Sequence, residues 1–176
     1  MAIILHGEKC LLRPWRWGDE PTLIANANNR NVWRNLMDHF PYPYGREEAQ
    51  NWIALCEGSA EVPNRLAIEV DGDAIGGVGV EFQEDVYKRI GLVGYWLGED
   101  YWGRGIATEA LKLATEHAFT QFDIVRLQAG VFGWNQASMR VLEKAGYNLE
   151  GIMRRAVFKD GEITDLHLYA KLRSEN

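Results

Sequence analysis

The stretch GYWLGEDYWGRGIATEAL, residues 94 to 111, decides the fold. It reads as a strand that runs into a glycine-containing turn, and the turn opens directly into a helix. Backbone N–H groups in the first turn of a helix have no intrahelical partner, and the helix dipole makes that end positive. Glycines at 103 and 105 keep side chains away from a bound anion. The stretch therefore predicts a diphosphate site, and a tight strand-to-helix turn without a ligand is the alternative.

Two widespread phosphate motifs are absent from this stretch. No Gly-Lys-Ser/Thr ending marks a P-loop, and no full G-x-G-x-x-G marks a dinucleotide fold. The choice between a ligand site and a plain turn therefore depends on the flanking sequence.

Hydrophobic periodicity and turn residues predict the remaining elements. Strands are expected over residues 8–15, 66–70, 74–82, 89–97, 124–131, 149–158 and 162–172. Helices are expected from residue 19, over 31–37, 49–56 and 105–119, and from 135 to a stop at 146. Asp71-Gly72 and Asp160-Gly161 are hairpin turns. This order predicts one α/β (α+β) domain over residues 1–176, built on a mixed sheet.

Composition excludes several classes of protein. The chain has 176 residues with 19 Lys+Arg against 25 Asp+Glu, a formal net charge of −6, which disfavours nucleic acid as a partner. No apolar run reaches the roughly 18 residues of a membrane helix, and the start lacks a signal-peptide pattern. We therefore expect a cytoplasmic protein with no membrane association. Cys10 and Cys56 are expected as reduced thiols, and no metal site is expected.

The flanking sequence resembles the RimJ/RimL-like branch of the GNAT superfamily of acyl-CoA-dependent N-acetyltransferases. The resemblance rests on four segments that occur in the same order, 12–14 (LRP), 40–43 (FPYP), 94–97 (GYWL) and 169–170 (YA). It implies a GNAT fold with a central mixed, mostly antiparallel sheet flanked by helices. It also implies acetyl-CoA as the co-substrate.

The family's signature Q/R-x-x-G-x-G/A binds the coenzyme A diphosphate through main-chain amides. Here the matching run begins with Trp102, which replaces the usual Gln or Arg. By resemblance, the diphosphate-binding residues are Trp102, Gly103, Arg104, Gly105, Ile106, Ala107 and Thr108.

The pantetheine arm is expected to lie beside two further segments. Asn135 begins a run that resembles the family's N-x-x-S/A helix, and this residue also fits an N-cap. The backbone of Tyr95, Trp96 and Leu97 is expected to pair with the pantetheine amides and to hold the thioester oxygen. In the family, the neighbouring strand, here residues 124–131, splays away at this point.

Two proton-transfer residues are predicted. Many GNAT members use a tyrosine seven residues after the asparagine as the acid, but that position is Leu142 here. Ser138 is the nearest replacement, as in RimL-like proteins, and a water is the alternative donor. Glu81 is the candidate base, ahead of the residues Glu84, Asp85 and His39, and a water-relayed deprotonation is the alternative.

The acceptor implied by the resemblance is a primary amine. A protein N-terminal α-amine is the first candidate, and polyamines or aminoglycosides are the alternatives. Because Leu142 and Trp102 depart from the family pattern, a coenzyme A-binding protein without turnover is a second hypothesis. Trp33 and the loop 40–44 are candidate walls of an acceptor pocket. An exposed sheet edge over residues 162–172 would allow a homodimer.

Overall fold

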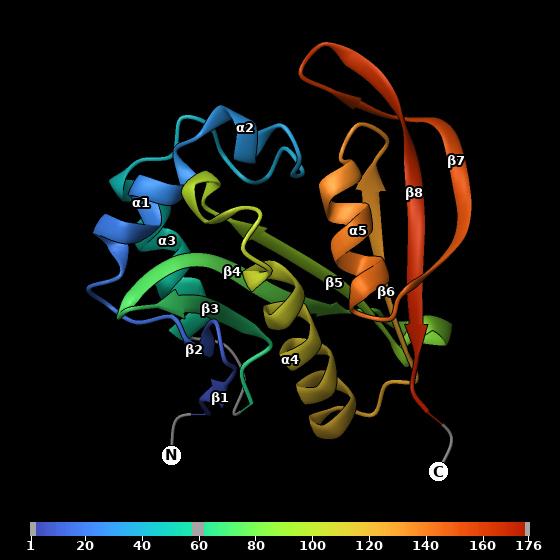
Figure 1. The fold of residues 1–176 in the computed structure, drawn as a ribbon, viewed down its shortest axis with the longest axis horizontal. Helices are drawn as coiled ribbons and strands as arrows, with labels where there is room; N and C mark the ends of the chain where they lie inside the picture. Colours follow the sequence, from blue (N-terminus) through green and yellow to red (C-terminus); the bar gives the residue numbers. More distant parts are fainter. Residues whose placement is uncertain (1–2, 58–61, 175–176) are drawn as a thin grey trace.

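The computed structural model describes residues 3–57 and 62–174, which form one sheet with helices on both faces (Figure 1). The strands are β1 (Leu5–His6), β2 (Leu11–Pro14), β3 (Arg65–Val70), β4 (Asp73–Phe82), β5 (Ile90–Leu97), β6 (Arg126–Phe132), β7 (Asn148–Lys159) and β8 (Glu162–Leu172). Their order in the sheet is β1-β2-β3-β4-β5-β6-β8-β7. Among the strands of these described residues, only β5 and β6 pair in parallel. The predicted mixed, mostly antiparallel sheet is confirmed.

Helices cover the two faces of this sheet with two separate cores. The α-helices are α1 (Glu20–Ala27), α2 (Arg30–Trp33), α3 (Arg46–Glu57), α4 (Ile106–Gln121) and α5 (Gln136–Lys144), with short 3-10 turns η1 (Asp85–Tyr87) and η2 (Glu99–Tyr101). Side chains of α4 and α5 pack into the larger core, whereas α1 and α3 contribute to the smaller one. Among the described residues, no helix is both long and apolar enough to cross a bilayer.

Two predicted elements have different bounds in the structure. The strand predicted over residues 8–15 is present but shorter, as β2, because the Gly7 N–H bonds the Cys10 carbonyl at 2.9 Å and closes a turn between β1 and β2. The helix predicted over 31–37 is limited to α2. The Asn29 side chain caps its first turn, and after Trp33 the chain continues in turns, with Asn35 N–H bonded to Val32 oxygen at 3.2 Å.

The predicted sheet edge over residues 162–172 is also wrong. β8 pairs with β6 along one side, from Arg126↔Leu172 to Phe132↔Leu166. On its other side β8 pairs with β7, so β7 is the outer strand (Figure 1). The hairpin turn at Asp160-Gly161 was predicted correctly, but the sequence did not show which arm of the hairpin faces β6.

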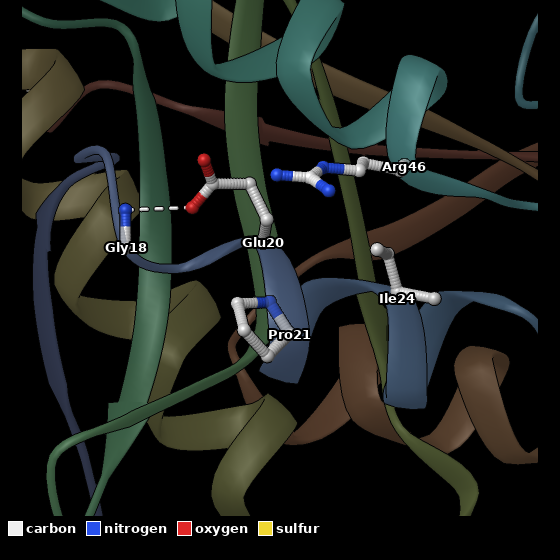
Figure 2. A pocket seen from close by; sticks show the side chains of 5 residues that line it. All are labelled: Gly18, Glu20, Pro21, Ile24 and Arg46. Atoms are coloured by element: carbon white, nitrogen blue, oxygen red, sulfur yellow. Dashed lines mark hydrogen bonds between the residues drawn. The ribbon is translucent and has the colours of Figure 1, made fainter.

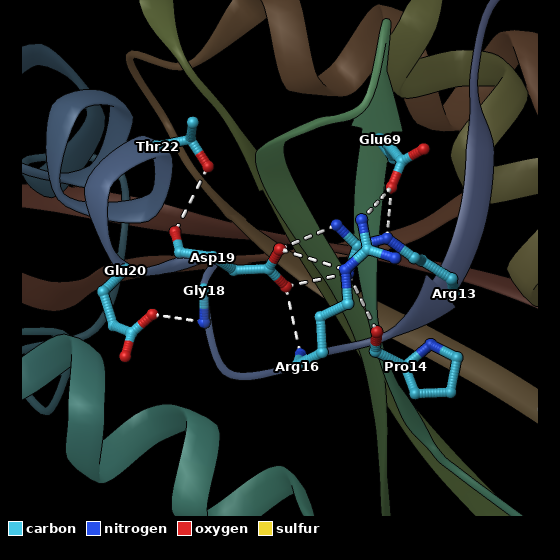
Figure 3. A network of polar contacts seen from close by, with 8 residues as sticks. All are labelled: Arg13, Pro14, Arg16, Gly18, Asp19, Glu20, Thr22 and Glu69. Carbon is cyan, nitrogen blue, oxygen red and sulfur yellow. Dashed lines mark hydrogen bonds and ion pairs between the residues drawn. The ribbon is translucent and has the colours of Figure 1, made fainter.

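A buried ion-pair network joins β2, β3 and the start of α1 (Figure 3). The Arg13 guanidinium donates two hydrogen bonds of 2.8 Å to the Asp19 carboxylate, and both side chains are 5% exposed. Arg13 also bonds the Glu69 carboxylate on β3. Asp19 precedes α1 but its side chain makes no capping bond, because it is turned towards Arg13 and the Arg16 N–H. The network fixes the angle at which α1 leaves the sheet.

Replacing Asp19→Ala is expected to lower the free energy of unfolding by about 3 kcal/mol, because the Arg13 charge loses a buried partner. Urea denaturation of the purified protein measures this change. Asp123→Ala is the matched control, since its pair with Arg89 has side chains 84% and 51% exposed, and it should cost less than about 1 kcal/mol. Equal small losses in both variants would contradict a stabilising role of the network.

Candidate active site

A wedge-shaped gap opens between β5 and β6. The two strands pair only from Ile90↔Arg126 to Leu92↔Gln128, whereas β5 stays paired with β4 as far as Leu97↔Gly76. From residue 93 onward, one edge of β5 therefore has no neighbouring strand among the described residues. The predicted splay of β6 away from this part of β5 is present.

Backbone alternation determines which groups face the gap. Gly98 donates its N–H to the Ile75 carbonyl on β4, and the Ile90 carbonyl accepts from Gln83 on the same side. Because successive residues of a strand direct their backbone groups to opposite edges, even-numbered residues of β5 face β4 and odd-numbered ones face β6. Tyr95 and Leu97 therefore direct N–H and C=O into the gap, and Trp96 directs its own towards β4.

The turn between η2 and α4 carries unpaired amides at the wide end of this gap. Gly103 and Gly105 have φ of 75° and 79°, the left-handed region that suits glycine. No described residue accepts a hydrogen bond from the backbone N–H groups of residues 103–108. A Cβ added at Gly103 would meet no described atom within 4 Å. Six free donors at the positive end of a 16-residue helix fit a diphosphate.

The side chains of this turn point away from an amide-bound anion. The Trp102 indole N–H donates to the Leu97 carbonyl at 2.8 Å, so the residue that replaces Gln or Arg closes the end of β5. Arg104 turns back on η2, where it bonds the Asp100 carbonyl at 2.7 Å and lies over the Tyr101 ring. Ile106 is buried in the larger core, while the neighbouring Ala107 and Thr108 are half-buried.

Sequence reasoning missed a lysine beside this turn. The β1–β2 turn is held on α4 by Glu109, whose carboxylate accepts the N–H groups of Glu8, Lys9 and Cys10 at 2.7 to 3.1 Å. These bonds lower the pKa of Glu109, although burial opposes the shift. The three hydrogen bonds to Glu109 place the Lys9 ammonium 3.1 Å from the Arg104 carbonyl and close to Gly105. The contacts span about 100 residues of sequence, so no local pattern reveals them.

The start of α5 lies across the gap from β5. Asn135 caps the helix, because its side-chain oxygen accepts the Ser138 N–H at 3.1 Å. The Ser138 hydroxyl is 2.8 Å from the Tyr95 hydroxyl, which also reaches the Ser138 carbonyl at 3.2 Å. The structure therefore brings together Tyr95, Asn135 and Ser138, three of the predicted site residues.

Glu81 lies on the face of the sheet opposite to the Tyr95 side chain, near the uncovered backbone of Gly94. It pairs with Leu92, and the adjacent pair on the same face is Gly79↔Gly94. A diagonal neighbour on one sheet face is roughly 7 Å away, which places the Glu81 side chain within reach of the space above Gly94. A Cβ at Gly94 would meet no described atom within 4 Å, and both residues are exposed.

Aromatic side chains lie further along that face. Trp96 is 5.5 Å from Phe40, ring centre to ring centre, and Trp33 stacks on Tyr42 at 5.6 Å. The β7–β8 turn reaches the same region, since the Lys159 ammonium sits 3.6 Å from the Trp33 ring centre. The predicted aromatic loop and the hairpin tip thus flank one region.

A separate hollow lies away from the gap. It has a volume of about 550 Å³ (Figure 2). It is lined by Gly18 in the turn before α1, by Glu20, Pro21 and Ile24 of α1, and by Arg46 at the start of α3. None of the predicted site residues lines it. Among the described residues, no group of His, Cys, Asp and Glu could hold a metal ion.

This arrangement defines the class of protein. The gap, the free amides and the polar start of α5 suit a phosphorylated thioester whose arm lies along β5. The model of the acetyltransferase (GNAT) domain matches residues 9–148, so the chain belongs to the GNAT acetyltransferases. It is an N-acetyltransferase enzyme, and acetyl-CoA is its co-substrate.

Individual relatives cover nearly the whole chain. The Bacillus subtilis (strain 168) protein "Probable N-acetyltransferase YjcK" is 42% identical over 98% of this chain and 99% of its own length. Spermidine N(1)-acetyltransferase of Escherichia coli (strain K12) is 29% identical over 86% of this chain and 79% of its own. The structure of RimL, a ribosomal L7/L12 alpha-N-protein acetyltransferase in complex with coenzyme A, has a TM-score of 0.80 at 23% identity, covering 97% and 98% of the two chains.

Lys9→Met is expected to raise the Kd for coenzyme A about fivefold to tenfold at low salt. The reason is the loss of one cation beside the amide turn, the turn at residues 103–108 with its unpaired N–H groups. Calorimetric titration with coenzyme A measures this, and the difference from the unmodified protein should shrink as salt is added. Lys88→Met, at the other end of β5, removes the same exposed charge as a control. An unchanged Kd at low salt would contradict a contact between Lys9 and the ligand.

Proposed function

We propose that this enzyme transfers an acetyl group directly from acetyl-CoA to a primary amine, with a protein N-terminal α-amine as the first candidate acceptor. The observation that carries the proposal is the set of unpaired N–H groups at residues 103–108, beside the edge of β5 that β6 leaves open. This edge leads from the amides past Tyr95 towards the narrow end of the gap.

Binding roles follow from that geometry. The amides of residues 103–108 hold the diphosphate, and the gap-facing backbone of Tyr95 pairs with the pantetheine arm. Leu97 can offer only its N–H, because its carbonyl already accepts from Trp102. The expected backbone contact of Trp96 is wrong, because the Trp96 N–H and C=O face β4. The Asn135 side chain keeps its amide nitrogen for the arm while its oxygen caps α5. The thioester carbon then lies near Gly94.

Glu81 is the proposed base for the incoming amine. An α-amine of pKa near 8 needs about 1.4 kcal/mol to lose its proton at pH 7, whereas a lysine-like amine near 10.4 needs about 4.6 kcal/mol. An exposed carboxylate, or a water that it orients, suits the smaller of these two tasks. The open space above Gly94 leaves room for the amine on the same face as Glu81.

Ser138 is the proposed proton donor to the departing sulfur. As nitrogen bonds the acetyl carbon, the C–S bond breaks, and the sulfur takes the electron pair together with a proton. The amine loses one proton in the same reaction, so the overall count balances. Because a thiol is a good leaving group, a weak donor such as a hydroxyl suffices. The position of Ser138, hydrogen-bonded to β5 across the gap, supports this role.

The relatives supply two rival acceptors. RimL is named for a protein α-amine, and the Escherichia coli relative is named for spermidine. The pKa argument favours the α-amine, while the formal charge of −6 is compatible with a cationic polyamine. We place the reaction in the cytoplasm.

Thiol release with three acceptors tests this function: a peptide with a free α-amine, the same peptide with its α-amine blocked and a lysine added, and spermidine. The free α-amine should react fastest, and Ser138→Ala should lower its kcat about tenfold with an unchanged Kd for coenzyme A. Coenzyme A binding without thiol release for any amine would overturn the proposed transfer. Faster reaction of spermidine would reassign the acceptor.

We also propose a homodimer formed through β7. This outer strand exposes large apolar side chains, including Ile152 at 48%, Met153 at 55% and Phe158 at 71%. An exposed apolar edge strand favours pairing with another chain.

Sedimentation velocity should therefore show a dimer, and Met153→Glu should shift it to the monomer by placing a charge on that strand. Leu55→Glu alters an equally exposed leucine on α3 and serves as the control that leaves the dimer intact. A monomer at every protein concentration would contradict the proposed interface.

A further inference from the structure

We propose that Tyr95 is a positioning residue that holds the Ser138 hydroxyl in the orientation needed to give its proton to the departing sulfur. This role rests on the proposed function of Ser138 and adds a function to Tyr95, whose side chain would otherwise be assigned to core packing alone. It starts from one contact, the 2.8 Å between the Tyr95 and Ser138 hydroxyl oxygens.

The contact bridges the two sides of the gap. Tyr95 belongs to β5 beyond the last residue that pairs with β6, and Ser138 belongs to the first turn of α5. The Tyr95 ring packs against the larger core, and this packing holds the Tyr95 hydroxyl in place next to Ser138. The Ser138 backbone is fixed independently, because its N–H bonds the Asn135 side chain at 3.1 Å. Both partners are therefore held before any substrate arrives.

Counting protons shows what the contact can do. Each hydroxyl has one proton, and the Tyr95 hydroxyl has two acceptors in reach, the Ser138 hydroxyl at 2.8 Å and the Ser138 carbonyl at 3.2 Å. When Tyr95 donates to the hydroxyl oxygen, the Ser138 proton is free to point into the gap. When Tyr95 donates to the carbonyl, Ser138 can donate back to Tyr95 instead. Rotation about the two C–O bonds is enough to exchange these states.

The donating state suits the proposed step. As the C–S bond breaks, Ser138 gives its proton to the sulfur, and the Tyr95 hydrogen bond stabilises the negative charge that develops on the serine oxygen. The proton lost by the amine reaches solvent, and solvent returns one to Ser138. Burial raises the pKa of Tyr95 and outweighs the hydrogen bond to Ser138, which lowers it, while the nearby Tyr147 and Tyr169 add to the rise. Tyr95 therefore stays neutral and keeps its own proton throughout.

Tyr95→Phe tests the role, because it keeps the ring and removes only the hydroxyl. We expect kcat for the preferred amine to fall about tenfold, with the KM for acetyl-CoA within about twofold of the unmodified enzyme. Tyr147→Phe is the matched control, since it removes another buried tyrosine hydroxyl, one that lies 2.7 Å from Thr115. That variant should leave kcat unchanged. Equal kcat for Tyr95→Phe and the unmodified enzyme would overturn the proposal.

Two further readouts separate positioning from a general structural effect. The double variant Tyr95→Phe with Ser138→Ala should be no slower than Ser138→Ala alone, because the tyrosine acts only through the serine. The kcat of the unmodified enzyme divided by that of Tyr95→Phe should fall towards one above a pH of about 9.5, because the departing thiolate then no longer needs a proton. Additive losses, or a ratio independent of pH, would overturn the proposal. Failure of the proposed function itself would appear differently, as coenzyme A binding without turnover in the unmodified enzyme.

Discussion

The parting of β5 from β6 after Leu92 is the constraint on which the site depends. A strand edge that loses its neighbour inside a sheet leaves backbone donors and acceptors without partners, and such groups are rarely left unpaired. β4 continues to bond the other edge of β5, so the strand keeps its course while one edge stays open. Trp102 satisfies one carbonyl at the wide end, and the rest of the edge is available to an extended amide-containing arm.

The amide turn at the start of α4 needs support because glycines alone do not fix it. That support comes from the N-terminal part of the chain, where three N–H groups of the β1–β2 turn bond Glu109 in the first turn of the helix. Buried apolar residues such as Ile106 and Ala110 then hold the helix on the sheet. The first turn is thus fastened on its side chains while its backbone amides stay free, which is the arrangement that an anion site requires.

Local signals sufficed for much of the fold but for less of the site. Asp71-Gly72 predicts its hairpin because both residues take positive φ, and the glycines at 103 and 105 mark the amide turn for the same reason. Distant contacts leave no such trace. The Lys9 and Glu109 bond, the Tyr95 and Ser138 bond, and the position of β8 inside the sheet all depend on packing between distant segments. The strand predicted from residue 8 begins only at Leu11, because residues 8–10 belong to a turn that bonds Glu109, about 100 residues away.

Amide hydrogen exchange with and without coenzyme A tests the central claim most directly, because it reports the backbone donors themselves. In the free protein, the amides of residues 103–108 and of Tyr95 should exchange fast relative to the neighbouring amides of α4 and β4. Saturating coenzyme A should slow exchange at these positions and leave β1 to β3 largely unchanged. Slow exchange there before coenzyme A is added, or protection that develops elsewhere, would contradict the account.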